Sequence, residues 1–403
     1  MTAAAGTDLA TVLSDLATRR STLGGFGPAP TGLAPDAIRL LGGTPGDEAL
    51  PTEQLQRVFA ETLADPAVSV AALQYSTAPG IEPLRAWIAA HEGTDPDRVL
   101  VTNGALHGLS LLFSAVLDPG DTVAVESPTF PLALRVLGHR GARVVPVPVT
   151  ADGLDLDSLE QRLRDGLRIK LLYLIPDFQN PTGATLPAVD RARAAELGER
   201  YGFLVVSDNP YRDLRFAGDP VDDLSLDSDA VVRVNTFSKT LGPGVRLGWL
   251  VTPEWLRPSL TQLRANIDQH TSLLTQTAIA RLLHTPGAFD DILTHARTLY
   301  SERAAALTGE LRDALPGTLD ITDAEGGIFL WARATDPDLD LTAVQTRARA
   351  LGTDFSLGRY FDPEGAVHYT DHLRLGFSNN TSADLRVAAR RLAEAFTASH
   401  RPA

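Results

Sequence analysis

The sequence contains no cysteine and no apolar run long enough to cross a bilayer. Without cysteine the chain forms neither disulfides nor thiolate metal sites, and this composition fits our expectation of a cytoplasmic protein. A membrane-spanning helix needs about 18 or more consecutive apolar residues, so we expect no membrane partner. Residues 1–13 show no basic start followed by a long apolar block, and we therefore predict no signal peptide.

Basic residues are scarce as well, since 36 Lys and Arg stand against 50 Asp and Glu and give a net charge of −14. A surface of this charge is a poor partner for polyanions, and we expect no binding of nucleic acid. This charge does not exclude local basic pockets for small anions. The length of 403 residues predicts two or three domains with a large core.

A lysine among anion-binding residues is the most informative feature of the chain. An apolar strand at 231–234 leads to Thr236, Ser238 and Lys239, and Arg246 follows after a turn rich in glycine and proline. An amine beside hydroxyl and guanidinium donors suits a nucleophilic lysine that holds a phosphorylated carbonyl compound as a Schiff base. The alternative is a surface loop with a solvated lysine.

From residue 98 onward, short β-branched runs alternate with helical patterns. Strands are expected at 99–101, 123–125, 143–149, 171–175, 203–208 and 231–234. The alternation predicts a mostly parallel sheet with right-handed crossovers and a ligand crevice at the carboxyl ends of its strands. Asp208 ends a nearly all-apolar strand, where an ionised carboxylate needs a partner such as a protonated pyridine nitrogen. Tyr211, three residues later, is placed to contact the same ligand.

Three more positions near strand ends have both a structural and a functional interpretation. Phe130 either caps the core or stacks on a planar ring bound in the crevice. Asn180, before a proline, is either a turn former or a ligand contact. Gly104 opens a helix whose free N–H groups suit a phosphate, although glycine also serves a plain turn there. His107, one turn inside that helix, has no second ligand at helical spacing, so no metal site is expected.

The two ends of the chain indicate a second, smaller unit. Residues 40–47 are expected to be irregular, and a helix at 53–63 precedes a loop that contains Tyr75. After helical stretches at 258–284 and 288–315, short strands that include Arg374 indicate an α+β domain. We therefore expect an N-terminal segment at 1–50 that joins the small domain, a large domain at 51–285 and a small domain at 286–403.

Taken together, these residues resemble the fold-type I pyridoxal-phosphate enzymes, the aspartate aminotransferase superfamily, over nearly the whole chain. The resemblance rests on their order along the chain: Tyr75, Gly104, Phe130, Asn180-Pro181-Thr182-Gly183, Asp208 with Tyr211, Ser238-Lys239, Arg246 and Arg374. The segment at 176–183 is similar to the branch that contains aminoadipate and kynurenine aminotransferases and the MocR regulators. Those regulators carry a DNA-binding domain ahead of this region, and the short stretch before residue 40 leads us to expect none.

The resemblance implies an α/β fold whose large domain has a mostly parallel seven-stranded sheet flanked by helices, and a homodimer with shared active sites. It also implies pyridoxal 5′-phosphate as cofactor. Lys239 would form the Schiff base and then move the α-proton, and Asp208 would keep the pyridine nitrogen protonated. The other expected contacts are Asn180 and Tyr211 to the ring hydroxyl, Phe130 to the ring face, Gly104, Ala105, Leu106, Thr236, Ser238 and Arg246 to the phosphate, Tyr75 to the phosphate of the neighbouring subunit, and Arg374, Asn180 and Gly43 to the substrate.

The reaction expected from this resemblance is transfer of an amino group between an L-amino acid and a 2-oxo acid. Many relatives have glutamine where this chain has Leu106 and His107, and often tyrosine at Phe130, which changes the surroundings of the ring. The alternative is therefore β-elimination, decarboxylation or oxidation on the same scaffold. A third hypothesis, a cofactor-binding sensor without turnover, would not need both Asp208 and Arg374 beside the lysine.

Overall fold

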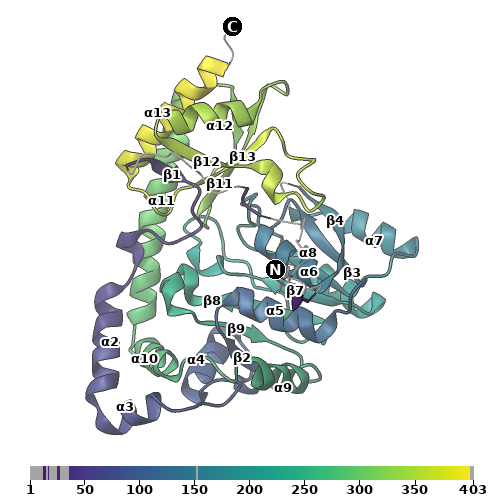
Figure 1. Cartoon of the computed structure of the whole chain (residues 1–403), viewed down its shortest axis with the longest axis vertical. Coiled ribbons are helices and arrows are strands. Elements are labelled where there is room, and N and C mark those ends of the chain that lie inside the picture. The colour runs from purple at the N-terminus through teal and green to yellow at the C-terminus, as the bar shows by residue number, and fades with distance from the viewer. Residues whose placement is uncertain (1–11, 15–16, 18–24, 28–35, 151–152, 400–403) are drawn as a thin grey trace, which may run out of the picture.

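The computed structural model describes residues 12–14, 17, 25–27, 36–150 and 153–399. In this part of the chain an eight-stranded sheet and a five-stranded sheet are each covered by helices, and the five-stranded sheet lies at one end of the molecule, as Figure 1 shows. None of the helices in the described ranges is long and apolar enough to cross a membrane.

The larger sheet has the strand order β2-β9-β8-β7-β6-β3-β4-β5. Its strands are β2 (Val99–Thr102), β3 (Thr122–Ser127), β4 (Arg143–Thr150), β5 (Gly153–Leu154), β6 (Leu171–Leu174), β7 (Leu204–Asp208), β8 (Val231–Thr236) and β9 (Gly248–Val251). Strands β3, β4, β6, β7 and β8 are parallel to one another, whereas β2, β9 and β5 pair antiparallel with their neighbours. The mostly parallel sheet is confirmed, and the expected seven strands are joined by an eighth of two residues, β5.

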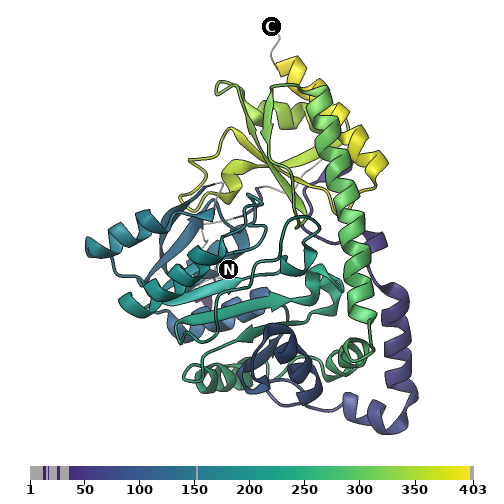
Figure 2. The same ribbon diagram turned by 180° about the vertical axis from the view of Figure 1, so that it is seen from behind.

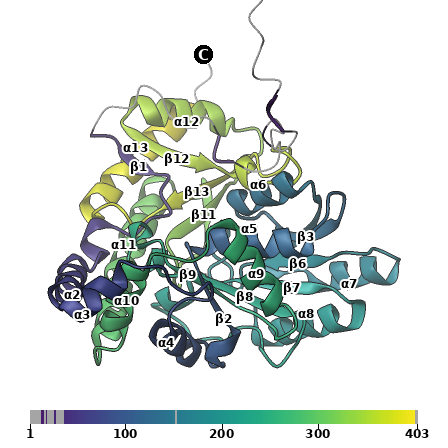
Figure 3. The same cartoon turned by 60° about the horizontal axis from the view of Figure 1, so that its bottom comes forward.

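Both faces of this sheet are buried, which explains why its strands are nearly continuous apolar runs. Leu171 and Tyr173 of β6 belong to one buried apolar cluster, whereas Leu172 and Leu174 belong to the other. Helices α5 (Ala105–Val116), α6 (Pro131–Arg140) and α9 (Arg257–Ile267) pack on the first face, and α4 (Glu82–Glu92), α7 (Leu156–Arg164), α8 (Ala188–Tyr201) and α10 (Leu273–Leu283) pack on the second. Figure 3 shows the sheet between α5 and α9 on one side and α4 and α8 on the other.

The smaller sheet has the order β1-β12-β13-β11-β10 and joins the start of the described chain to its last third. Its strands are β1 (Ile38–Leu40), β10 (Leu319–Ile321), β11 (Phe329–Ala334), β12 (Thr353–Leu357) and β13 (His372–Gly376). Strand β1 pairs in parallel with β12, so the segment around residues 38–40 contributes an edge strand to this sheet. The domain boundaries at residues 50 and 285 stay a prediction.

The helices of this end are α11 (Ala288–Ala314), α12 (Leu341–Ala350) and α13 (Ser382–Ser399), and α13 packs against both of the others. Helix α11 runs along most of the molecule beside both sheets, as Figure 2 shows from behind. The remaining helical elements are α2 (Thr52–Ala64), α3 (Pro66–Ala72) and the short 3₁₀ turns η2 (Asp47–Ala49), η3 (Pro96–Arg98), η4 (Arg212–Leu214), η5 (Phe237–Lys239), η6 (Pro243–Val245) and η7 (Gly358–Phe361).

One expected helical stretch, 258–284, consists of two helices. Helix α9 ends at Ile267 and α10 begins at Leu273. The break has a local cause, because the side chain of Ser272 accepts a hydrogen bond from the Thr275 N–H and caps α10. Between the two helices Asp268 forms an ion pair with Arg264 and accepts a hydrogen bond from Asn103. The loop therefore carries a carboxylate to the start of α5.

Candidate active site

A cavity of about 400 Å³ lies where the carboxyl ends of β6, β7 and β8 meet the smaller sheet and the segment after β1. Most residues predicted for the site line it: Gly43, Ala105, Leu106, Phe130, Asn180, Asp208, Tyr211, Thr236, Ser238, Lys239, Arg246 and Arg374. They come from segments up to 331 residues apart in sequence, and parallel strands bring them together because their carboxyl ends share one edge.

Lys239 stands at the end of η5, directly after the buried strand β8. Its Nζ donates a hydrogen bond of 2.6 Å to the Gly43 carbonyl and lies 5.9 Å from the ring centroid of Tyr211. Burial and the nearby Arg374 lower the pKa of Lys239 to about 8, although Asp208 acts in the opposite direction. The amine is thus partly neutral near neutral pH and is able to act as a nucleophile or a base.

Asp208 ends β7 on the floor of the cavity and is only 3% exposed. Its Oδ2 accepts a 2.7 Å hydrogen bond from the Tyr173 hydroxyl, while its Oδ1 is buried and has no hydrogen-bond partner. Burial raises the pKa of Asp208 to about 6, against the opposing effects of the Tyr173 hydrogen bond and of Lys239. A buried carboxylate oxygen without a partner is costly, so this atom fits a ligand that brings its own N–H donor.

Arg374 projects from β13 and is 2% exposed. Its Nη1 donates to Asn180 Oδ1 at 2.8 Å and its Nη2 donates to the Leu41 carbonyl at 2.9 Å. The guanidinium lies 3.8 Å from the ring centroid of Phe329 and 4.7 Å from that of Phe361. Burial lowers the pKa of Arg374 to about 9, so it is cationic at pH 7 and has no ion-pair partner within the described residues. A fixed cation without a carboxylate partner fits an anionic ligand.

Tyr211 follows Asp208 on the same wall of the cavity and is buried. Its ring packs edge-on against Phe329 at 6.1 Å between centroids, and burial raises its pKa. The hydroxyl therefore stays protonated and acts as a hydrogen-bond donor at neutral pH. Phe130 caps the start of α6 and is half-buried against the same cavity.

Hydroxyl, guanidinium and backbone donors gather at the opposite end of the cavity. The hydroxyls of Thr236 and Ser238 lie 2.9 Å apart, and Arg246 Nη2 donates to the Asn103 carbonyl at 2.7 Å. Gly104, the residue before α5, has φ of 84°, and a Cβ built on it would lie 2.9 Å from Arg246 Nη2. The positive φ favours glycine, and a side chain there would also displace the end of the Arg246 side chain. The N–H groups that begin α5 face this basic end, which suits a phosphate.

Of the predicted site residues, Gly104 and Tyr75 do not line the cavity; Gly104 adjoins it next to Ala105, whereas Tyr75 stands apart from it. Tyr75 is 82% exposed in the loop after α3, where its ring packs edge-on against His270 at 5.9 Å. Its contact with the phosphate bound by a neighbouring subunit stays a prediction.

Several residues of the cavity had no individual signal in the sequence. Phe26, Leu41 and Phe329 line it, and Tyr173 supports Asp208 from below. Tyr173 lies inside an apolar strand, where its hydroxyl needs a partner once the strand is buried, and this signal alone was available in advance. Phe26, Leu41 and Phe329 look like ordinary core residues, and only tertiary packing brings them to the site.

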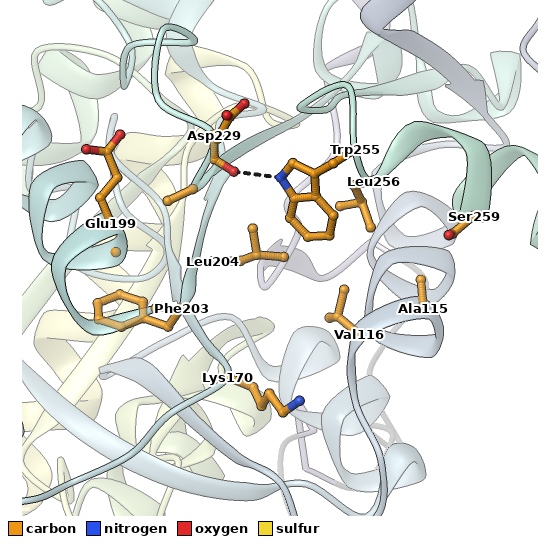
Figure 4. A pocket seen from close by; sticks show the side chains of 13 residues that line it. Ala115, Val116, Lys170, Glu199, Phe203, Leu204, Asp229, Trp255, Leu256 and Ser259 are labelled. Carbon is orange, nitrogen blue, oxygen red and sulfur yellow. Dashed lines mark hydrogen bonds between the residues drawn. The ribbon is translucent and has the colours of Figure 1, made fainter.

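A second cavity, of about 600 Å³, lies at the amino ends of β6, β7 and β8 and is lined by none of the predicted residues (Figure 4). Trp255 covers it with an indole N–H that donates to the Asp229 carbonyl, and Leu204 and Val116 form part of its apolar wall. Lys170 and Glu199 are the charged side chains at its rim that accompany Asp229. This cavity lies at the amino ends of the parallel strands, away from Lys239.

Comparisons with known proteins point to one family. Residues 48–392 match the family described as aminotransferase class I and II. The aromatic-amino-acid aminotransferase 1 of Thermococcus litoralis is 32% identical over 372 residues, which cover 89% of this chain and 88% of that protein. The 2-aminoadipate transaminase of Thermus thermophilus is 33% identical over 368 residues, which cover 90% of each chain. The crystal structure of LysN, an α-aminoadipate aminotransferase from Thermus thermophilus complexed with N-(5′-phosphopyridoxyl)-L-leucine, is similar with a TM-score of 0.86 and 31% identity, covering 96% of this chain and 98% of that one.

Proposed function

Since the chain belongs to the class I and II aminotransferase family and is a pyridoxal-phosphate-dependent aminotransferase, we propose that it moves an amino group between an L-amino acid and a 2-oxo acid in the cavity around Lys239. One observation carries this proposal. A lysine amine with a lowered pKa, a buried carboxylate oxygen without a partner and a buried arginine without a carboxylate partner among the described residues share one cavity. An amine, a ring-nitrogen acceptor and a carboxylate clamp are the three groups that this reaction needs.

The residues of the cavity fit pyridoxal phosphate. We propose that Asp208 accepts a hydrogen bond from the ring nitrogen through its free Oδ1, and that Asn180 and Tyr211 hydrogen-bond the ring hydroxyl. Phe130 would contact the ring face, and Gly104, Ala105, Leu106, Thr236, Ser238 and Arg246 would bind the phosphate. When bound, the cofactor supplies an aldehyde that condenses with amines and a ring that withdraws electrons from the α-carbon of the substrate.

Lys239 would perform two tasks in this site. It would hold the aldehyde covalently, and once an incoming amino acid has taken its place, its neutral Nζ would remove the α-proton and donate it to the former aldehyde carbon. The lowered pKa supports both, because each task requires a neutral amine near neutral pH. The hydrogen bond to the Gly43 carbonyl orients the amine when it is free.

Arg374 would bind the α-carboxylate of the substrate through two nitrogens of its guanidinium. Its planar face is held against Phe329, and its bonds to Asn180 and to the Leu41 carbonyl fix its rotation before the substrate arrives. A bidentate carboxylate contact needs this fork geometry, and lysine cannot reproduce it.

The rest of the cavity favours an amino acid with an apolar or aromatic side chain. Within the described residues, the lining that these roles leave over includes Phe26, Leu41, Leu132 and Phe329, and it carries no further charge. Burying a second carboxylate against this wall without a compensating cation would cost about 2 kcal/mol or more of binding free energy. We therefore expect phenylalanine and leucine to be better donors than aspartate in an assay with a common 2-oxo acid acceptor, and a preference for aspartate would contradict this substrate class.

We also propose a cytoplasmic homodimer in which Tyr75 reaches the phosphate bound by the neighbouring subunit. The exposed apolar side chains Leu63, Val70 and Leu73 lie close to Tyr75 in sequence and support a covered surface there. A mixture of subunits tests the shared site. Tyr75→Ala and Lys239→Ala subunits are each expected to be impaired alone, whereas mixed dimers regain one intact site, and unchanged activity after mixing would refute the shared site.

The reaction itself is tested by incubating the loaded protein with single amino acids. Transamination converts the bound cofactor to its amine form, with a shift in its absorbance, and releases the matching 2-oxo acid. Release of ammonia with pyruvate, or of carbon dioxide, would support the alternative reactions instead. Borohydride reduction followed by peptide mass analysis is expected to find the cofactor on Lys239, and Lys239→Arg, which keeps the charge, serves as the control.

A further inference from the structure

The backbone of Asn103, just before the start of α5, is held on both sides by side chains. Its N–H donates a 3.0 Å hydrogen bond to His107 Nδ1, and its carbonyl accepts a 2.7 Å bond from Arg246 Nη2. The Asn103 side chain donates to Asp268 Oδ2 at 2.6 Å. His107 and Arg246, which come from different parts of the chain, thus hold the two peptide groups on either side of the Asn103 Cα.

The position of His107 in the helix explains this contact. Gly104 is the N-cap residue of α5 and has no side chain that could bind the free N–H groups. The helix begins at Ala105, and His107 is its third residue. A third-residue side chain that reaches back to a backbone N–H before the helix stabilises the first turn, and glutamine commonly has this role. In this chain an imidazole has this role, and the N–H that it binds belongs to Asn103, one residue before the N-cap Gly104. The bond fixes the turn whose N–H groups point to the basic end of the cavity.

The hydrogen bond also defines the protonation state of the ring. Because the Asn103 N–H is the donor, Nδ1 of His107 is unprotonated, and the neutral ring carries its proton on Nε2, which faces Asp268 Oδ2 at 3.6 Å. The charged groups that act on the ring are Asp268, Arg264 and Arg246. Burial lowers the pKa of His107, and the two arginines add to this effect, whereas Asp268 opposes it. The ring is therefore neutral at pH 7 and above.

We propose that His107 is a positioning residue for the cofactor phosphate. Its unprotonated Nδ1 holds the Asn103 N–H. The fixed Asn103 backbone in turn keeps the N–H groups at the start of α5 and the guanidinium of Arg246 in the arrangement that binds the phosphate. Protonation places an N–H on Nδ1 opposite the Asn103 N–H, which breaks the bond and loosens the turn. This inference rests on the proposed function, since it assumes that the phosphate binds at this turn.

Two substitutions at position 107 test the proposal through cofactor affinity rather than turnover. His107→Leu leaves the Asn103 N–H without its acceptor and is expected to weaken binding of pyridoxal phosphate to the cofactor-free protein by about tenfold. His107→Gln offers a side-chain oxygen that accepts the same N–H, and its affinity at pH 7.5 is expected to equal that of the wild type. Pyridoxal, which has no phosphate, is expected to bind all three proteins with equal affinity.

The pH dependence gives a second readout. Between pH 7.5 and pH 5 the wild-type affinity for pyridoxal phosphate is expected to fall relative to that of His107→Gln, because glutamine does not titrate and every other group is common to both. The exposed His139, in the last turn of α6, is the matched control, and His139→Gln is expected to behave as the wild type.

Two results would overturn the proposal. One is a His107→Leu protein that binds pyridoxal phosphate as tightly as the wild type. The other is a wild type that binds more tightly than His107→Gln at pH 5, since the added charge would then act by attraction to the phosphate. Should the wild type itself bind pyridoxal phosphate no better than Lys239→Ala, the proposed function fails instead.

Discussion

Tyr173→Phe tests the electrostatics at the floor of the site, because it removes the hydroxyl that donates to Asp208 Oδ2 at 2.7 Å. Folding raises the pKa of Asp208 from the ordinary value of 3.8 to about 6, which corresponds to roughly 3 kcal/mol of lost stability at pH values above 6. The sign follows from the raised pKa. The unfolded state ionises first as the pH rises, so this carboxyl lowers stability between pH 4 and pH 6 and keeps it low above.

Removal of the hydroxyl raises the pKa of Asp208 further. A hydrogen bond to a charged group contributes about 1.5–3 kcal/mol, whereas a bond between neutral groups contributes about 1 kcal/mol. At pH 8 Asp208 is ionised, and we expect Tyr173→Phe to lower the free energy of unfolding by about 2 kcal/mol or more. At pH 5 the carboxyl is mostly protonated in both proteins, and the expected loss is about 1 kcal/mol or less.

Urea unfolding of the cofactor-free protein at pH 5 and pH 8, followed by circular dichroism, measures both values. Tyr369→Phe is the matched control, because the Tyr369 hydroxyl bonds the neutral hydroxyl of Ser127 at 2.9 Å, and its loss is expected to be the same at both pH values. A loss for Tyr173→Phe that does not differ between pH 5 and pH 8 would refute an ionised Asp208 held by Tyr173.

Three further predictions concern binding and chemistry. The rate at which the cofactor-free protein captures pyridoxal phosphate is expected to rise with pH through about 8 and then to level off, because the neutral form of Lys239 is the nucleophile. Stopped-flow absorbance measures this rate, and a rate that does not change with pH would exclude the lowered pKa. Arg374→Lys is expected to raise KM for the amino acid at least tenfold, since a single ammonium replaces a bidentate fork, while the affinity for pyridoxal phosphate stays unchanged in the same preparation. Gly104→Ala combines a φ of 84° with a Cβ at 2.9 Å from Arg246, so we expect the free energy of unfolding in urea to fall by about 1–2 kcal/mol and cofactor binding to weaken. Gly183→Ala is the control for the backbone cost alone, because Gly183 has a φ of 74° and nothing lies within 4 Å of its Cβ.

Much of the architecture follows from local pattern. The apolar runs that form β6, β7 and β8 cannot lie at the surface, and runs of that length separated by helical segments pack as parallel strands. Once the strands are parallel, the residues after them share one edge, so Asp208 and Lys239 were expected at a common site from their positions alone. The break between α9 and α10 was not predicted, because no glycine or proline follows Pro258 in the stretch 258–284.

The supporting residues were a different matter. Phe329 and Phe361 are ordinary apolar positions within their own segments, and the hydroxyl of Tyr173 indicates that it needs a partner without indicating which one. Their roles arise from distance in space: Tyr173 meets Asp208 because β6 and β7 are neighbours, and Phe329 meets Arg374 because β11 pairs with β13. His107 was considered as a metal ligand and as a change in the surroundings of the ring, whereas its partner is a backbone N–H four residues earlier.

The sequence by itself therefore determined the elements, the parallel sheet and the chemical groups of the site, because helical and strand periodicities and turn residues are local properties. Only the tertiary structure decided which atoms of those groups are paired and which are free. The unpaired Oδ1 of Asp208, the lowered pKa of Lys239 and the guanidinium of Arg374 held between rings depend on burial and on neighbours far apart in the chain. Those neighbours set the local dielectric and the hydrogen bonds, and with them the protonation states on which the chemistry depends.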